Sequence, residues 1–125
     1  MSYDSDVMTS QDLEKLKGIV DEKGRILMNR IKNNVGTFSW WLSGIFEPSL
    51  KPSTSIATYH NLQSEFQQFK RQYKNLKANS LLKYRNKYNP WANYFDRMDR
   101  HIMQTQKILE KYAIIHIKKL DIMEE

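Results

Sequence analysis

The stretch from Phe66 to Phe95 concentrates the two residue types that proteins use to bind polyanions. Its basic residues, with no acid among them, are Lys70, Arg71, Lys74, Lys77, Lys83, Arg85 and Lys87. Its aromatic residues are Phe66, Phe69, Tyr73, Tyr84, Tyr88, Trp91, Tyr94 and Phe95. Cations neutralise phosphates, and planar rings stack on bases or brace the cations. The composition of this stretch therefore predicts nucleic acid, with DNA favoured, as the partner.

The first part of the predicted site is a column of lysines. Lys70, Lys74 and Lys77 recur at spacings of four and three residues, so they lie along one side of a helix. A solvated helix face is the alternative interpretation, although such a face normally mixes both signs of charge. The column is therefore predicted to contact phosphates, while Arg71 turns to another side of the helix.

The second part of the predicted site runs from Lys83 to Asn89, where charge and ring alternate. Its predicted contact residues are Lys83, Tyr84, Arg85, Lys87 and Tyr88. Phosphate contacts follow the shape of the backbone and carry little base specificity. The sequence has no helix-turn-helix spacing and no zinc-finger pattern, so a coating or packaging protein is favoured over a sequence-reading regulator.

No pattern in the sequence predicts catalysis, a cofactor or a metal. The histidines, His60, His101 and His116, have no second histidine or carboxylate three or four residues away. The glycines form no phosphate-binding loop. Asp96 and Asp99 alternate with arginines, a spacing typical of surface ion pairs on a helix. The chain is predicted not to be an enzyme.

A run of large apolar residues from Phe38 to Phe46 is the second candidate contact surface. It contains Phe38, Trp40, Trp41 and Phe46 and is far shorter than the roughly 20 residues needed to cross a bilayer. The sequence predicts a short helix or turn that caps the core, with a plug against another protein or a membrane surface as the alternative. Residues 47–55, which contain Pro48 and Pro52, are predicted to form a loop.

The totals indicate one folded domain. The chain has 125 residues, no cysteine and a net charge of +6. Outside the basic stretch, 13 bases and 14 acids sum to −1, so the basicity is local. A hydrophobic fraction of 40% suits a folded protein. Residues 1–9 resemble a flexible acidic tail with no secretion signal, which predicts a soluble intracellular protein, or a virion protein if the source is viral.

Apolar periodicity predicts three long helices. The first begins at Thr9 and runs to about Asn33, although Gly18 and Gly24 each cost it about 1 kcal/mol relative to alanine. The second is capped among Ser53, Thr54 and Ser55, and its apolar seam is Tyr59, Leu62, Phe66, Phe69, Tyr73 and Leu76. Ser80 and Lys83 interrupt that seam, so the packed helix should end, bend or leave the core near Asn79.

The third helix is predicted to start at Asn89-Pro90 and to continue for around thirty residues, to about Leu120. No strand is predicted in any part of the chain. The predicted fold class is therefore all-α, an up-and-down bundle of three or four helices. The tryptophan run would close one end of it or form the fourth, short helix.

A small, cysteine-free, tyrosine-rich basic chain with Trp40-Trp41 and a Tyr88-Asn89-Pro90-Trp91 helix start resembles the coat proteins of archaeal viruses, both filamentous and spindle-shaped. This resemblance implies helical-bundle subunits that assemble in many copies and, in the filamentous families, wrap DNA. It also implies that the first helix and Trp40-Trp41 are arms or plugs between subunits. A protein-protein adaptor that docks a partner through the seam and Trp40-Trp41 is an alternative, and a peripheral membrane-binding protein is another.

Overall fold

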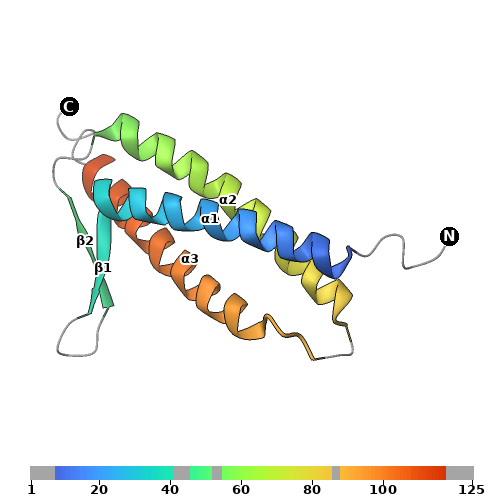
Figure 1. The fold of residues 1–125 in the computed structure, drawn as a ribbon. Helices are drawn as coiled ribbons and strands as arrows, with labels where there is room; N and C mark the ends of the chain where they lie inside the picture. The colour runs from blue at the N-terminus through green and yellow to red at the C-terminus, as the bar shows by residue number, and fades with distance from the viewer. Residues whose placement is uncertain (1–7, 41–45, 52–54, 86–87, 118–125) are drawn as a thin grey trace.

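The computed structural model describes residues 8–40, 46–51, 55–85 and 88–117, without the side chains of 38–40, 46–47 and 116–117. Its element order is α1, a two-stranded hairpin (β1 and β2), α2 and α3, followed by a short π-helical segment, η2. The three long helices run up, down and up, and the hairpin lies across one end of them (Figure 1). The predicted helical bundle is confirmed.

Helix α1 (Ser10–Asn34) begins where the sequence predicts. Thr9 is extended, and its Oγ1 accepts a hydrogen bond of 3.1 Å from the backbone N–H of Asp12. This bond satisfies one of the N–H groups that have no partner within the helix. Apolar residues at helical spacing form its buried face, with Leu13, Val20, Leu27, Ile31 and the following Val35 in the core. The local signals were therefore sufficient for this helix.

The prediction that the chain has no strand is wrong. β1 (Gly36–Trp40) and β2 (Phe46–Leu50) pair in antiparallel fashion, with Trp40 opposite Phe46 and Gly36 opposite Leu50. β2 also replaces the first part of the predicted 47–55 loop. Aromatic residues and threonine favour strands, and the two short segments satisfy each other's backbone hydrogen bonds. Gly36 permits the pairing because the carbonyl of Ser49 occupies the space that a side chain would need.

The hairpin is tied to the helices at their shared end. The backbone N–H of Lys51 donates to the carbonyl of Val35 over 2.8 Å, and Lys111 Nζ donates to the carbonyl of Pro48 over 2.9 Å. In Figure 1 the hairpin stands beside the end of α1 and the last turns of α3. The described parts of the segment predicted to form a short helix or turn, residues 38–40 and 46, are therefore strands beside this end of the bundle.

Helix α2 (Ile56–Lys83) provides the middle of the core. Ser55 is the N-cap and accepts a 3.1 Å hydrogen bond from the N–H of Thr58. All six residues of the predicted seam are buried within the chain, which leaves no seam surface for docking a partner helix. The helix does not leave the core near Asn79, because Ser80 is fully buried as well.

Helix α3 (Ala92–Tyr112) is followed by η2 (Ala113–Ile117). The predicted thirty-residue helix is therefore divided into two helical types, and its predicted end at Leu120 lies outside the described residues. Phe95, Met98, Ile108 and Leu109 face the core. The ring of Tyr112 stacks on that of Tyr59 with centroids 4.4 Å apart, which fixes the end of α3 against the start of α2.

Candidate nucleic-acid interface

The lysine column of α2 faces α3 at two of its three positions. Lys70 Nζ donates to Oε1 of Gln106 over 2.9 Å and lies 5.3 Å from the centre of the Phe66 ring. Lys77 Nζ forms an ion pair of 2.7 Å with Oδ2 of Asp99. Lys74 is exposed and has no hydrogen bond or ion pair within the described part of the chain. Two of the three predicted phosphate contacts are thus engaged inside the protein.

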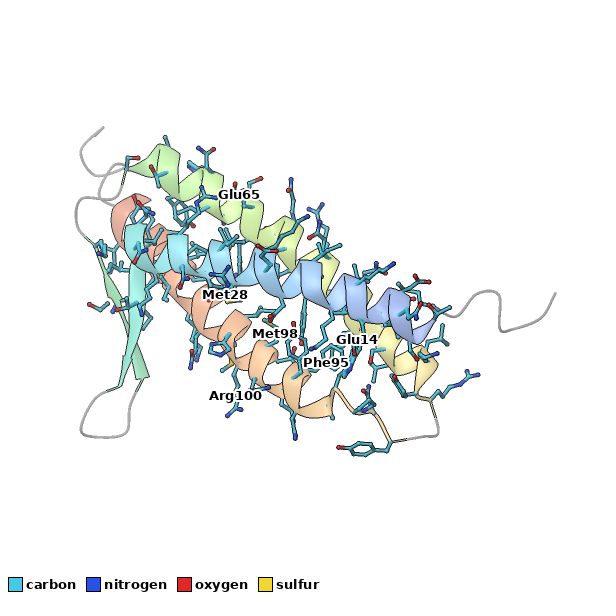
Figure 2. The ribbon with its side chains drawn as sticks, in the orientation of Figure 1. Glu14, Met28, Glu65, Phe95, Met98 and Arg100 are labelled. Carbon is cyan, nitrogen blue, oxygen red and sulfur yellow. The ribbon has the colours of Figure 1, made fainter. Side chains whose placement is uncertain are left out.

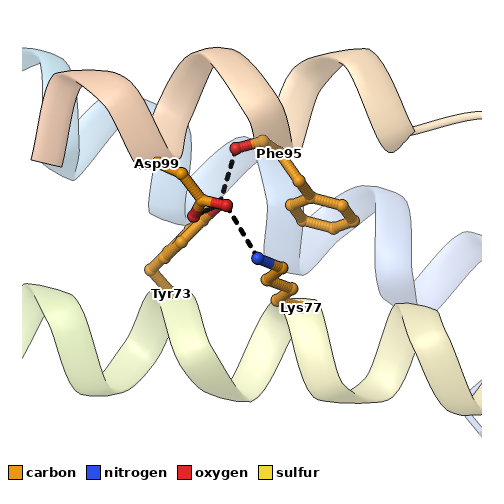
Figure 3. Close-up of polar contacts among 4 residues, drawn as sticks. All are labelled: Tyr73, Lys77, Phe95 and Asp99. Carbon is orange, nitrogen blue, oxygen red and sulfur yellow. Dashed lines mark hydrogen bonds and ion pairs between the residues drawn. The ribbon is translucent and has the colours of Figure 1, made fainter. Parts of the chain in front are cut away.

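Tyr73 completes the network around Lys77 and Asp99 (Figure 3). Its hydroxyl donates to Oδ1 of Asp99 over 2.7 Å and lies 3.1 Å from the carbonyl oxygen of Phe95. Burial, followed by the hydrogen bond and the charge of Asp99, raises the pKa of Tyr73 well above its ordinary value. Tyr73 therefore stays a neutral donor that links α2 to α3.

Asp99 is held in its charged form by the same network. Partial burial on its own raises the pKa of Asp99, but hydrogen bonds from Lys77 and Tyr73, together with the charge of Lys77, outweigh burial. The net pKa of Asp99 therefore lies below its ordinary value. The sequence suggested that Asp99 forms a surface ion pair with a neighbouring arginine of the same helix. Its partner is instead Lys77 of α2, and residue spacing within one helix cannot indicate a partner on another helix.

The connector between α2 and α3 begins with residues that still belong to the core. The N–H of Tyr84 donates to the carbonyl of Ser80 over 3.0 Å, and its ring centre lies 6.5 Å from that of Trp91. Tyr84 is half-buried, so it is a packing residue rather than an open stacking surface. Lys83 is also half-buried, at the last position of α2.

Farther along the connector, predicted contact residues reach solvent. Arg85 is exposed, and the ring of Tyr88 is 82% exposed. Lys87 lies outside the described residues. Arg71, which the sequence left aside, is exposed on α2. The exposed part of the candidate interface therefore consists of Lys74, Arg85 and Tyr88, with Lys83 at its edge.

Asn89 anchors the connector. The sequence indicated it as part of a helix start but did not indicate its bond to Ser80. Its Oδ1 accepts a 2.9 Å hydrogen bond from the N–H of Trp91, the residue that precedes α3. Its Nδ2 donates over 3.1 Å to the hydroxyl of Ser80. Ser80 interrupts the apolar seam, and its buried hydroxyl is hydrogen-bonded by the half-buried Asn89. A small polar residue at a seam position was the available signal.

The apolar contact surface predicted at Phe38, Trp40, Trp41 and Phe46 falls within the hairpin. The structure places the backbones of Phe38, Trp40 and Phe46 in the two strands. Trp41 and the side chains of the other three lie outside the described residues. Their predicted role in protein or membrane contact stays a prediction.

No group of three or more histidine, aspartate or glutamate side chains among the described residues is arranged to hold a metal ion. No helix in the described part of the chain is long and apolar enough to span a membrane. Comparison with protein families, with curated proteins and with solved structures finds no match to this chain.

Proposed function

We propose that this chain is a structural DNA-binding protein, of the viral coat or nucleocapsid class, that holds the phosphate backbone at the connector end of α2. The observation that carries the proposal is that Lys74, Lys83 and Arg85 have no acidic partner in the described part of the chain. No acid occurs anywhere between Phe66 and Phe95. Unpaired cations in such a stretch create the positive potential that attracts a phosphate backbone.

The exposed ring of Tyr88 adds to this argument. A large ring that is 82% exposed loses the stabilisation that burial provides, so its position has no role in the core of the single chain. In the same connector as Arg85, it offers an apolar surface for sugars or for bases at a strand end. Charge and ring together support contact with nucleic acid rather than with a simple anion.

The coat or nucleocapsid class is supported by the fold and by the resemblance of the sequence. The resemblance to archaeal virus coat proteins implies helical-bundle subunits, and the three long helices of this chain form such a bundle. Contacts that follow the backbone and carry little base specificity suit a protein that covers DNA in many copies. The proposed location is accordingly the virion, and the proposed state is a homo-oligomer on DNA.

A titration of fluorescent duplex DNA at several salt concentrations tests the proposal. For Z phosphates contacted, log K falls with log salt at a slope of roughly −0.9Z. Arg85→Gln should reduce the magnitude of this slope by about 0.9, because one phosphate contact is lost. Lys107→Gln is the matched control, since Lys107 is an exposed cation on α3 outside the connector. Equal effects of the two variants, or no binding at low salt, would overturn the proposal.

Electron micrographs of the purified protein with and without DNA test the coat class separately. Ordered filaments or particles are expected when DNA is present. Binding in solution with no ordered assembly would remove the coat class and leave DNA binding intact. Vesicle flotation with and without anionic lipid tests the alternative that the protein binds a membrane surface.

A further inference from the structure

A groove runs between α1 and α3 on a side of the bundle that the basic stretch does not include. It is made of two hollows of about 390 and 310 Å³, each large enough for part of an extended ligand. His101 lines both hollows, so they are neighbours along α3. Along α1 the groove extends from Lys17 to Lys32, about 22 Å at 1.5 Å per residue. The hairpin residues Gly36 and Thr37 line one end of it.

The walls of this groove are positively charged. Its basic residues are Lys17 and Lys32 on α1 and Arg97 on α3, and Asp21 is the single acid among the lining residues. Oδ1 of Asp21 accepts a 3.3 Å hydrogen bond from the hydroxyl of Tyr94. The ion pairs among the described residues are Arg30 with Glu65 and Lys77 with Asp99, so none of the three groove cations forms an ion pair there.

One of these cations is braced by aromatic rings. Lys17 Nζ lies 4.8 Å from the centre of the Tyr94 ring and 5.7 Å from that of Trp91. Such contacts hold an ammonium group in place without removing its charge. The end of the groove nearest the connector therefore has a positioned cation.

The lining of the groove includes buried apolar side chains. Met98 and Ile108 on α3 and Ile31 on α1 line the groove and are each at least nine-tenths buried. Cations together with apolar side chains suit a ligand that has regularly spaced anions on one side and flat apolar groups on the other. Single-stranded nucleic acid has this arrangement. A duplex presents its phosphates on a convex surface and keeps its bases paired inside, so it cannot fill the hollows.

We infer that the α1–α3 groove binds single-stranded nucleic acid, with phosphates on Lys17, Arg97 and Lys32 and bases over Met98. The inference rests on the proposed function and deepens it, because it adds a second surface and names the strand type that this surface prefers. Only one of the three cations, Arg97, lies within three residues of the basic stretch. The packing of α1 against the bundle supplies the other two.

The test uses the full-length protein and two labelled probes, a short oligothymidylate and a duplex. Arg97→Gln and Lys32→Gln should each weaken oligothymidylate binding and reduce the magnitude of its salt slope by about 0.7, the value for one phosphate contact on a single strand. Duplex binding should change little in either variant. Arg100→Gln is the matched control, since Arg100 is an exposed arginine on α3 that does not line the groove (Figure 2). Circular dichroism verifies that every variant is folded.

Each other outcome overturns the inference in a recognisable way. If Arg97→Gln and Lys32→Gln match Arg100→Gln on oligothymidylate while Arg85→Gln still weakens duplex binding, the groove is not a site and the proposed function stands. If the wild type binds neither probe, both proposals fail. If polyglutamate binds with the same dependence on Arg97 and Lys32 and oligothymidylate does not bind, the groove takes an acidic protein segment instead.

Discussion

The hydroxyl of Tyr73 lies 2.7 Å from Oδ1 of Asp99, and this hydrogen bond joins α2 to α3. The other carboxylate oxygen of Asp99 pairs with Lys77, so one acid fixes two residues of the neighbouring helix. The ring of Tyr73 also packs edge-on against Phe95, with centroids 6.0 Å apart. A basic residue that the sequence assigned to phosphate binding thus contributes to holding the bundle together.

Removal of the Tyr73 hydroxyl should therefore destabilise the protein. Tyr73→Phe keeps the buried ring and loses the bond to a charged acceptor, so the free energy of unfolding should fall by about 1–2 kcal/mol. Urea denaturation measures this change. Tyr84→Phe is the control, because Tyr84 is a half-buried tyrosine whose hydroxyl makes no hydrogen bond within the described residues. An equally small effect of both substitutions would mean that the Tyr73 bond adds nothing to stability.

The same network predicts how stability depends on pH. The pKa of Asp99 is lowered in the folded state. Its contribution to folding stability is therefore fully present above the pKa of the unfolded chain, about 3.9, and is lost as the pH falls through the lower pKa of the folded state. Near neutral pH the free energy of unfolding of the wild type should exceed that of Asp99→Asn by about 1 kcal/mol. The difference is small because the ion pair is partly exposed. The difference should narrow as the pH falls below about 4.

Urea midpoints of the two proteins across this pH range provide the measurement. Asp96→Asn serves for comparison, because Asp96 is exposed on the same helix and forms no ion pair within the described part of the chain. A difference for Asp99→Asn that widened toward acid pH would have the wrong sign for this network.

Two glycines of α1 should respond in opposite directions to alanine. A Cβ at Gly24 would lie 2.7 Å from Cζ of Phe69, whereas a Cβ at Gly18 would meet nothing within 4 Å. Gly24→Ala should lower the free energy of unfolding by about 1–2 kcal/mol, since the Phe69 ring is buried and must shift. Gly18→Ala should raise the free energy of unfolding by about 0.5–1 kcal/mol, because alanine has a higher helix propensity than glycine. Thermal and urea unfolding of the pair decide the matter, and a Gly24→Ala protein as stable as Gly18→Ala would contradict the packing described.

Asn89 should matter to stability as much as a core residue does. Asn89→Ala leaves the fully buried hydroxyl of Ser80 and the N–H of Trp91 without their partner, so about 1–3 kcal/mol should be lost. Asn93→Ala is the control, because Asn93 is exposed on α3 and has no hydrogen-bond partner among the described side chains. Urea denaturation of both variants tests this prediction, and an Asn89→Ala protein as stable as Asn93→Ala would show that the connector is not anchored through Ser80.

The local parts of the fold could be predicted from the sequence. The caps at Thr9 and Ser55 and the seam from Tyr59 to Leu76 act within one helix, where spacing alone determines which side chains share a face. The bounds of α1 and the start of α2 were therefore predicted closely, whereas α2 runs past Asn79 to Lys83. The start of α3 was predicted to within three residues, because Asn89-Pro90 is a strong boundary signal.

Other features of the fold depend on which helices and strands contact one another, and only the tertiary structure decided them. The hairpin forms because two short segments satisfy each other's backbone groups, and neither segment carries that information alone. Within the described residues Lys77 forms an ion pair and Lys74 does not, because α3 presents Asp99 to Lys77. Gly24 is a close contact rather than a weakness because Phe69 occupies the space beside it. The sequence determined the kinds of charge and ring available, and packing between helices decided which of them remain free to bind.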